Sequence, residues 1–131
     1  LNNYEVHLFV YRDCDGDGAD FDDPAYLFIF DENGSLYEKV DMPFSERETV
    51  QPPTDICVET LPDICVEKTE YIATVNLPAT NGEYTLVYQR YSRNSTVLNI
   101  FAPDQTGSSY TSVIPTTNLA ICNNSPVFRR S

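Results

Sequence analysis

Residues 25–42 decide the fold, and they read AYLFIFDENGSLYEKVDM. The first six form a nearly continuous apolar run, which is typical of a β-strand covered on both faces. The polar residues that follow contain Asn33-Gly34, a pair that favours the tight turn of a β-hairpin. Leu36 to Met42 then provides the returning strand. The stretch therefore predicts an antiparallel hairpin over 25–42.

Further strand patterns lie on both sides of this hairpin. On the N-terminal side, Val6, Leu8 and Val10 fall on one face of an alternating segment over 4–11. On the C-terminal side, strands are expected over 71–77, 83–91, 96–101 and 110–114. No segment shows a helical period with capping residues. About eight short strands separated by turns predict an all-β fold, an antiparallel β-sandwich.

One pentapeptide makes the prediction more specific. Gly82-Glu83-Tyr84-Thr85-Leu86 resembles the corner at which a tyrosine opens a late strand of immunoglobulin-like folds. The side chain two residues after that tyrosine is expected to point inward. We therefore expect an immunoglobulin-like outline.

Length and charge narrow the range of functions. The chain has 131 residues, which is the length of one domain, and we expect residues 1–131 to fold as one. Twenty acidic residues against eight basic ones give a net charge of −12. Nucleic acid and anionic membrane surfaces bind basic faces, so neither is an expected partner. No apolar run is long enough to cross a bilayer, and we expect no membrane insertion.

The cysteines indicate an oxidising compartment. Cys14, Cys57, Cys65 and Cys122 are an even number, which allows three disulfide pairings. Zinc is the competing hypothesis, but no C-x-x-C spacing occurs and His7 is the single histidine. Disulfides are the favoured hypothesis, and they imply a secreted or cell-surface protein.

A repeat suggests one of the bridges. Asp-Ile-Cys-Val-Glu occurs at 55–59 and again at 63–67, around Leu61-Pro62. Two extended arms closed by a Cys57–Cys65 bridge would explain the repeat. Accidental similarity of two loop segments is the alternative.

An acidic loop follows the first strand. Alternate aspartates and two glycines place oxygen ligands around a sharply bent backbone, as Ca²⁺ requires. The candidate ligands are Asp13, Asp15, Asp17, Ala19, Asp20, Asp22 and Asp23. Position 12 of an EF-hand-type loop would be Pro24, so the closing acid of that motif is missing. We predict one calcium ion, because crowded carboxylates repel one another without a cation. A solvated acidic turn is the alternative.

Catalysis has little support in the sequence. His7 lies inside an alternating strand and is expected to be an ordinary strand residue. Nucleophilic mechanisms that need a histidine base have no other candidate. The acidic residues cluster with metal-like or surface spacing. We expect no enzymatic activity.

Aromatic, cationic and amide groups gather near the end of the strand over 83–91. They are Tyr88, Arg90, Tyr91, Arg93 and Asn94. Carbohydrate-binding modules use such groups, because rings stack on sugars while arginine and asparagine bond the hydroxyls. The alternative is that Tyr84, Leu86 and Tyr88 face the core and Arg90 pairs with an acid.

Several phrases together resemble a known family. They are Tyr11-Arg12-Asp13-Cys14, Tyr88-Gln89-Arg90 with Arg93-Asn94, and the phrase CNNSPVF at 122–128. The chain resembles an N-terminal module of very large surface proteins of Bacteroidota. Those proteins carry PKD-like or other immunoglobulin-like repeats and a gliding-motility-associated domain for type IX secretion.

The resemblance implies an extracellular all-β module that serves adhesion or a surface filament, cut from a much larger protein. The expected partners are neighbouring domains of the same chain or a surface or glycan ligand. Relatives often carry a cysteine pair where this chain has Tyr91 and Ser92, so those two belong to one bridge. The remaining cysteines would then pair as Cys57–Cys65 and Cys14–Cys122.

Overall fold

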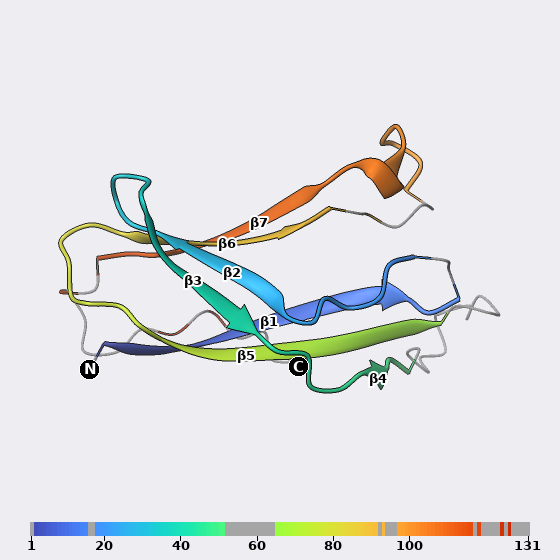
Figure 1. Ribbon diagram of the computed structural model, residues 1–131, viewed down its shortest axis with the longest axis horizontal. Helices are drawn as coiled ribbons and strands as arrows, with labels where there is room; N and C mark the ends of the chain where they lie inside the picture. The colour runs from blue at the N-terminus through green and yellow to red at the C-terminus, as the bar shows by residue number, and fades with distance from the viewer. Residues whose placement is uncertain are drawn as a thin grey trace.

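The computed structural model describes residues 2–15, 18–51, 65–91, 93, 97–116, 118, 124 and 126. Within them the chain forms two antiparallel sheets (Figure 1). The three-stranded sheet has the order β1-β5-β4, made of β1 (Asn3–Asp13), β5 (Val66–Asn76) and β4 (Glu48–Thr49). The four-stranded sheet has the order β3-β2-β6-β7, made of β3 (Leu36–Met42), β2 (Ala25–Phe30), β6 (Tyr84–Arg90) and β7 (Ser108–Ile114). A single turn of 3-10 helix, η1 (Pro103–Gln105), lies between β6 and β7.

The strand order is that of an immunoglobulin-like sandwich. β1, β5 and β4 take the places of strands B, E and D, and β3, β2, β6 and β7 take those of C′, C, F and G. Three connections cross from one sheet to the other, β1 to β2, β3 to β4 and β5 to β6, as in a Greek key. The expected all-β sandwich is confirmed.

The hairpin at 25–42 forms as expected, and its turn has a clear cause. The Asp31 carboxylate accepts hydrogen bonds from the backbone N–H groups of Asn33 and Ser35, both at 2.9 Å. Gly34 has φ 75°, a conformation that glycine adopts without a steric cost. Strand pairing runs from Ala25 opposite Met42 to a register shift after Ile29.

The core lies between the sheets and is built from alternate residues of each strand. β1 supplies Val10, with Val6 and Leu8 packed against the buried cluster, so the expected inward face of this strand is confirmed. Tyr71, Ile29, Met42, Leu77 and Val75 are the largest fully buried side chains. They come from both sheets, so burial of these groups holds the two layers together.

The tyrosine corner is also confirmed. Tyr84 opens β6, is 5 % exposed, and donates a hydrogen bond from its hydroxyl to the Pro78 carbonyl at 3.1 Å. The Tyr37 ring packs edge-on against it at 5.4 Å between centroids. Leu86, two residues later, is buried as expected. The bond fixes the connection from β5 to β6 where the chain changes sheets.

Two strand predictions were wrong. Residues 97–101 of the expected strand over 96–101 form turns and bends, while residue 96 lies outside the described part. β4 was not predicted, because two exposed residues carry no alternation to detect. It pairs with β5, where the Lys68 ammonium meets the Glu48 carboxylate at 3.1 Å. The described residues contain seven strands rather than about eight.

The expected disulfide pairing was wrong as well. The structure joins Cys14 to Cys65, whose Cα atoms are 5.3 Å apart, in place of Cys57–Cys65 and Cys14–Cys122. Asp13 pairs with Val66 in the last register position of β1 and β5, and the Cys14 N–H donates to the Cys65 carbonyl at 3.1 Å. The bridge therefore extends the β1–β5 ladder by one pair. Cys57 and Cys122 lie outside the described residues.

We predict that Tyr84→Phe lowers the free energy of unfolding by about 1 kcal/mol, because the bond to the Pro78 carbonyl is lost and the ring stays in place. Urea unfolding at neutral pH measures the change. Tyr110→Phe is the control, since Tyr110 is 59 % exposed and its ring stacks on Tyr88. Equal stability of Tyr84→Phe and wild type would contradict the corner's structural role.

Candidate functional site

The acidic loop between β1 and β2 is held by both sheets. The Tyr71 hydroxyl, from β5 in the three-stranded sheet, donates to the Asp22 carbonyl at 2.7 Å. The Tyr88 hydroxyl, from β6 in the four-stranded sheet, donates to the Asp22 carboxylate at 2.9 Å. One residue of the loop thus receives a buried hydroxyl from each layer.

Arginines surround Asp20, which lies two residues before Asp22 in the same loop. The Asp20 carboxylate bonds the Arg12 guanidinium at 2.7 Å and the Arg47 guanidinium at 3.0 and 3.1 Å. Arg90 donates to the carbonyls of Ala19 and Asp20 at 3.1 and 2.9 Å. Three arginines from distant parts of the chain therefore meet at one acidic segment. We call this group the arginine clamp: Arg12, Arg47 and Arg90.

The clamp also shifts proton affinities. The Arg47 guanidinium, with the Phe21 N–H, holds the pKa of Asp20 below its usual range. The same hydrogen bond to Asp20 raises the pKa of Arg47. A lowered carboxyl pKa stabilises the fold above the ordinary pKa of an aspartate, and that stabilisation is lost as the pH falls through the lowered value. These groups are exposed, so solvent weakens the effect.

The predicted calcium ligands are mostly engaged with protein partners. Besides Asp20 and Asp22, the Asp23 carboxylate accepts the Phe44 N–H at 3.1 Å, and that of Asp13 accepts the Asp15 N–H at 3.0 Å. Within the described residues no three acidic, histidine or cysteine side chains converge as metal ligands would. Asp17 lies outside those residues.

The predicted sugar-binding group does not come together on one surface. Tyr88 is 5 % exposed and belongs to the core, and Arg90 serves the clamp. The Arg93 guanidinium donates to the Gly107 carbonyl at 3.2 Å, while Tyr91 is exposed. Asn94 lies outside the described residues. The structure agrees with the alternative stated for this group, in which Tyr88 faces the core.

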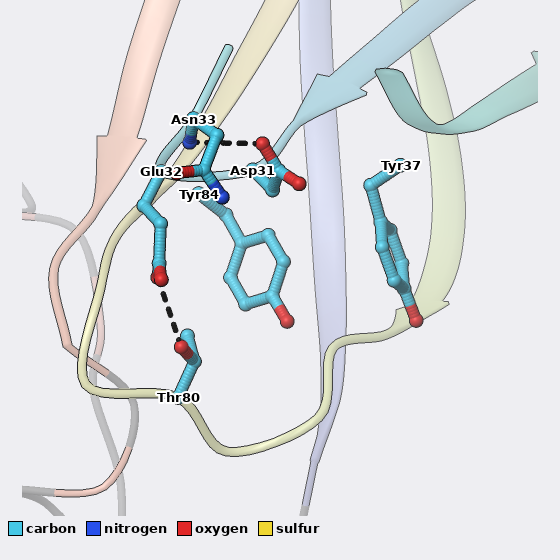
Figure 2. A pocket seen from close by; sticks show the side chains of 6 residues that line it. All are labelled: Asp31, Glu32, Asn33, Tyr37, Thr80 and Tyr84. Atoms are coloured by element: carbon cyan, nitrogen blue, oxygen red, sulfur yellow. Dashed lines mark hydrogen bonds between the residues drawn. The ribbon is translucent and has the colours of Figure 1, made fainter. Parts of the chain in front are cut away.

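An open cavity of about 220 Å³ lies beside the β2–β3 turn (Figure 2). Asp31, Glu32, Asn33, Tyr37, Thr80 and Tyr84 line it. The Glu32 carboxylate accepts the Thr80 hydroxyl at 3.0 Å, and it occupies the space that a Cβ at residue 82 would take, which explains Gly82. Sequence reasoning missed this cavity because it joins a hairpin turn to a loop almost fifty residues away.

The chemistry of this cavity suits a small polar ligand. Two carboxylates and one amide can accept or donate bonds to hydroxyl groups, and the Tyr37 ring is 43 % exposed beside them. The volume is below the range of most small-molecule sites, so a single sugar ring or smaller group is the size that fits.

The connection from β6 to β7 presents three exposed apolar side chains. Tyr91 is 74 % exposed, Leu98 97 % and Phe101 95 %. We call these three residues the apolar tip. In Figure 1 the connection extends past the end of the β6–β7 hairpin, at the same end of the sandwich as the loop between β1 and β2. The sequence predicted a strand that included Leu98 and Phe101, and it did not indicate that these side chains are exposed on a loop.

The connection that carries the apolar tip has defined internal bonds. Ala102 has φ 44°, a left-handed conformation that costs a non-glycine residue about 1 kcal/mol. Its carbonyl accepts the Gln105 N–H at 2.9 Å and the Thr106 hydroxyl at 3.0 Å. Such local strain, maintained by surrounding bonds, is frequent at functional loops.

His7 lies on the outer face of the three-stranded sheet, where its ring bonds Glu70 at 2.5 Å and Glu5 at 2.7 Å. These bonds, with Glu70 the larger cause, raise the pKa of His7. The residue is an exposed strand residue, as the sequence predicted.

Comparison with known proteins identifies no relative. No protein-family model, no curated protein and no solved structure matches the chain. In the part of the chain that the structure describes, no helix is long and apolar enough to span a membrane.

We predict that stability falls between about pH 10 and pH 12. Burial, and next the Asp22 carboxylate, raises the pKa of Tyr71 and of Tyr88 to about 12. A raised pKa contributes stability that is complete below the ordinary value near 10 and is lost as the pH rises through the folded value. Urea unfolding in this range should show a shallower pH dependence for the double variant Tyr71→Phe/Tyr88→Phe. An identical slope in variant and wild type would contradict the prediction.

Proposed function

We propose that the chain is a non-enzymatic, extracellular binding module of a bacterial cell-surface adhesin or surface filament. The observation that carries the proposal is the apolar tip, because Leu98 and Phe101 are almost fully exposed on a loop with defined internal bonds. Exposed apolar groups of this kind mark interaction sites. In immunoglobulin-like sandwiches the loop between the last two strands is a common binding element.

Three further features agree with the proposal. The Cys14–Cys65 bridge is typical of proteins from oxidising compartments. The net charge of −12 favours solubility and disfavours nucleic acid. The resemblance to modules of Bacteroidota surface proteins agrees with both, and it implies that the partners are neighbouring domains of the same chain or a surface or glycan ligand.

The tip is tested by probing arrays of glycans and immobilised extracellular proteins with the purified domain. We expect retained ligands whose binding falls about tenfold or more in Leu98→Ser/Phe101→Ser, because an apolar contact at the centre of an interface is lost. Ile72→Ser is the control, since Ile72 is 51 % exposed in β5, on the outer face of the three-stranded sheet. No ligand for the wild type, or equal losses in both variants, would overturn the proposal.

Carbohydrate binding is the second candidate, and the cavity beside the β2–β3 turn is the observation that favours it. The same glycan array distinguishes the two functions. Binding that is lost in Glu32→Gln and kept in Leu98→Ser/Phe101→Ser would assign a lectin-like site to the cavity. Binding with the opposite pattern would assign the site to the tip.

Calcium remains part of the proposal, in a smaller set of ligands. The carboxylates of Asp20, Asp22 and Asp23 bond groups on other elements, whereas that of Asp13 accepts a bond from within the loop, so we propose that the ion is bound by Asp13 and Asp15, together with Asp17, which lies outside the described residues. Extracellular calcium is abundant enough to fill weak sites.

A thermal melt in calcium, magnesium and chelator tests the ion. We expect a melting temperature that is higher in calcium alone, because binding to the folded state stabilises it. The increase should disappear in Asp15→Asn/Asp17→Asn. Equal melts in all three solutions would leave the segment as a solvated acidic turn.

A further inference from the structure

The outer face of the four-stranded sheet is apolar at its centre. β2 contributes Tyr26, Phe28 and Phe30 to this face, since Leu27 and Ile29 point into the core. Phe28 pairs with Val87 of β6, and Thr85 of β6 pairs with Val113 of β7. We call these outward residues the apolar face: Tyr26, Phe28, Phe30, Val87 and Val113.

The sequence indicates that this face is covered. Residues 25–30 form a continuous apolar run, which is the pattern of strands buried on both sides, whereas half-exposed strands alternate. Yet Tyr26 is 41 % exposed and Val113 50 % exposed. Phe28, Phe30 and Val87 are partly buried, and the Lys39 ammonium lies 3.6 Å from the centroid of the Tyr26 ring. The inward residues of this run, Leu27 and Ile29, are buried in the core. No second layer of described strands packs on its outward residues.

The charges on this face are few and self-complementary. Among the outward positions of the four strands only Lys39 and Asp41, both on β3, carry a charge, and they lie 3.6 Å apart. The remaining outward positions are Leu36 of β3, which pairs with Phe30 and extends the apolar face, and four polar, uncharged residues: Thr85, Gln89, Ser109 and Thr111. A face without net charge on a chain of −12 does not select a basic partner.

We propose that the apolar face binds a second copy of this chain in a two-fold symmetric, sheet-to-sheet dimer. A two-fold axis brings identical patches together, and one that crosses the strands midway between Lys39 and Asp41 pairs each of these residues with the other in the second copy, while the apolar residues of β2 cover one another. Four strands about 4.8 Å apart and five residues long present a patch of about 330 Å². That is about two fifths of the area per partner of a standard stable interface, so the dimer is weak and reversible. This surface is separate from the apolar tip, and the proposal does not depend on the function assigned to the tip.

The salt dependence follows from the same charges. Two copies of charge −12 repel at a distance, and salt screens that repulsion, while apolar contact at the face is little affected. Dimerisation should therefore strengthen as salt is raised. A charge-driven contact would weaken instead.

Sedimentation velocity over roughly 10 µM to 1 mM protein tests the dimer. We expect the average sedimentation coefficient to rise with concentration, and more steeply at high salt. Val113→Lys should weaken association about tenfold or more, because it places an unpaired charge on the apolar face. Ile72→Lys is a closely matched control, since Ile72 is 51 % exposed on the outer face of the other sheet, compared with 50 % for Val113.

Charge exchange adds a second, independent test. Lys39→Asp and Asp41→Lys should each weaken the dimer, whereas the two together should restore it, because the reciprocal pairing is regained. A wild type that stays monomeric throughout the range would overturn the proposal. So would equal effects of Val113→Lys and Ile72→Lys.

Discussion

The connection between β1 and β2 is the constraint on which the described sandwich depends most. It carries the chain from the three-stranded to the four-stranded sheet, and Asp22 within it accepts a hydroxyl from Tyr71 of one sheet and from Tyr88 of the other. Unpaired hydroxyls in the core would be costly, so these bonds favour one placement of the loop. The loop position in turn determines where Asp20 meets its arginines.

Charge balance at this end explains why so acidic a chain can be compact there. Arg12 and Arg47 neutralise part of the loop, and Arg90 bonds two of its carbonyls. The Cys14–Cys65 bridge lies next to this group and closes a loop of 51 residues, which in the chain-entropy model stabilises the fold by about 4 kcal/mol. The disulfide, the arginine clamp and the tyrosine bonds therefore act on neighbouring residues, at the end of the sandwich beside the apolar tip.

Much of the fold could be predicted, because its signals are local. The apolar run at 25–30, the Asn33-Gly34 turn and Tyr84 each specify structure within a few residues. The disulfide could not be predicted from spacing, because Cys14 and Cys65 meet only through the register of β1 and β5. Proximity in sequence suggested Cys57–Cys65, but strand pairing decides which cysteines are neighbours.

The candidate site was less predictable for the same reason. Seven acidic-loop residues look like metal ligands in sequence, and their hydrogen-bond partners come from strands and loops up to 71 residues away. Arg12, Arg47 and Arg90 show no common pattern in the sequence. The cavity beside Glu32 depends on Thr80, which lies in the connection between β5 and β6. An excess of acids indicates that cations are needed, but not that the chain supplies them itself.

A double-mutant cycle of Tyr71→Phe and Tyr88→Phe at neutral pH tests the central claim most directly. Each single variant should lose about 1 to 2 kcal/mol of unfolding free energy, since a buried hydrogen bond to Asp22 is removed. Because both bonds act on one residue, the double variant should lose less than the sum, by at least about 0.5 kcal/mol. Losses that add within about 0.3 kcal/mol would show that Asp22 does not couple the two sheets.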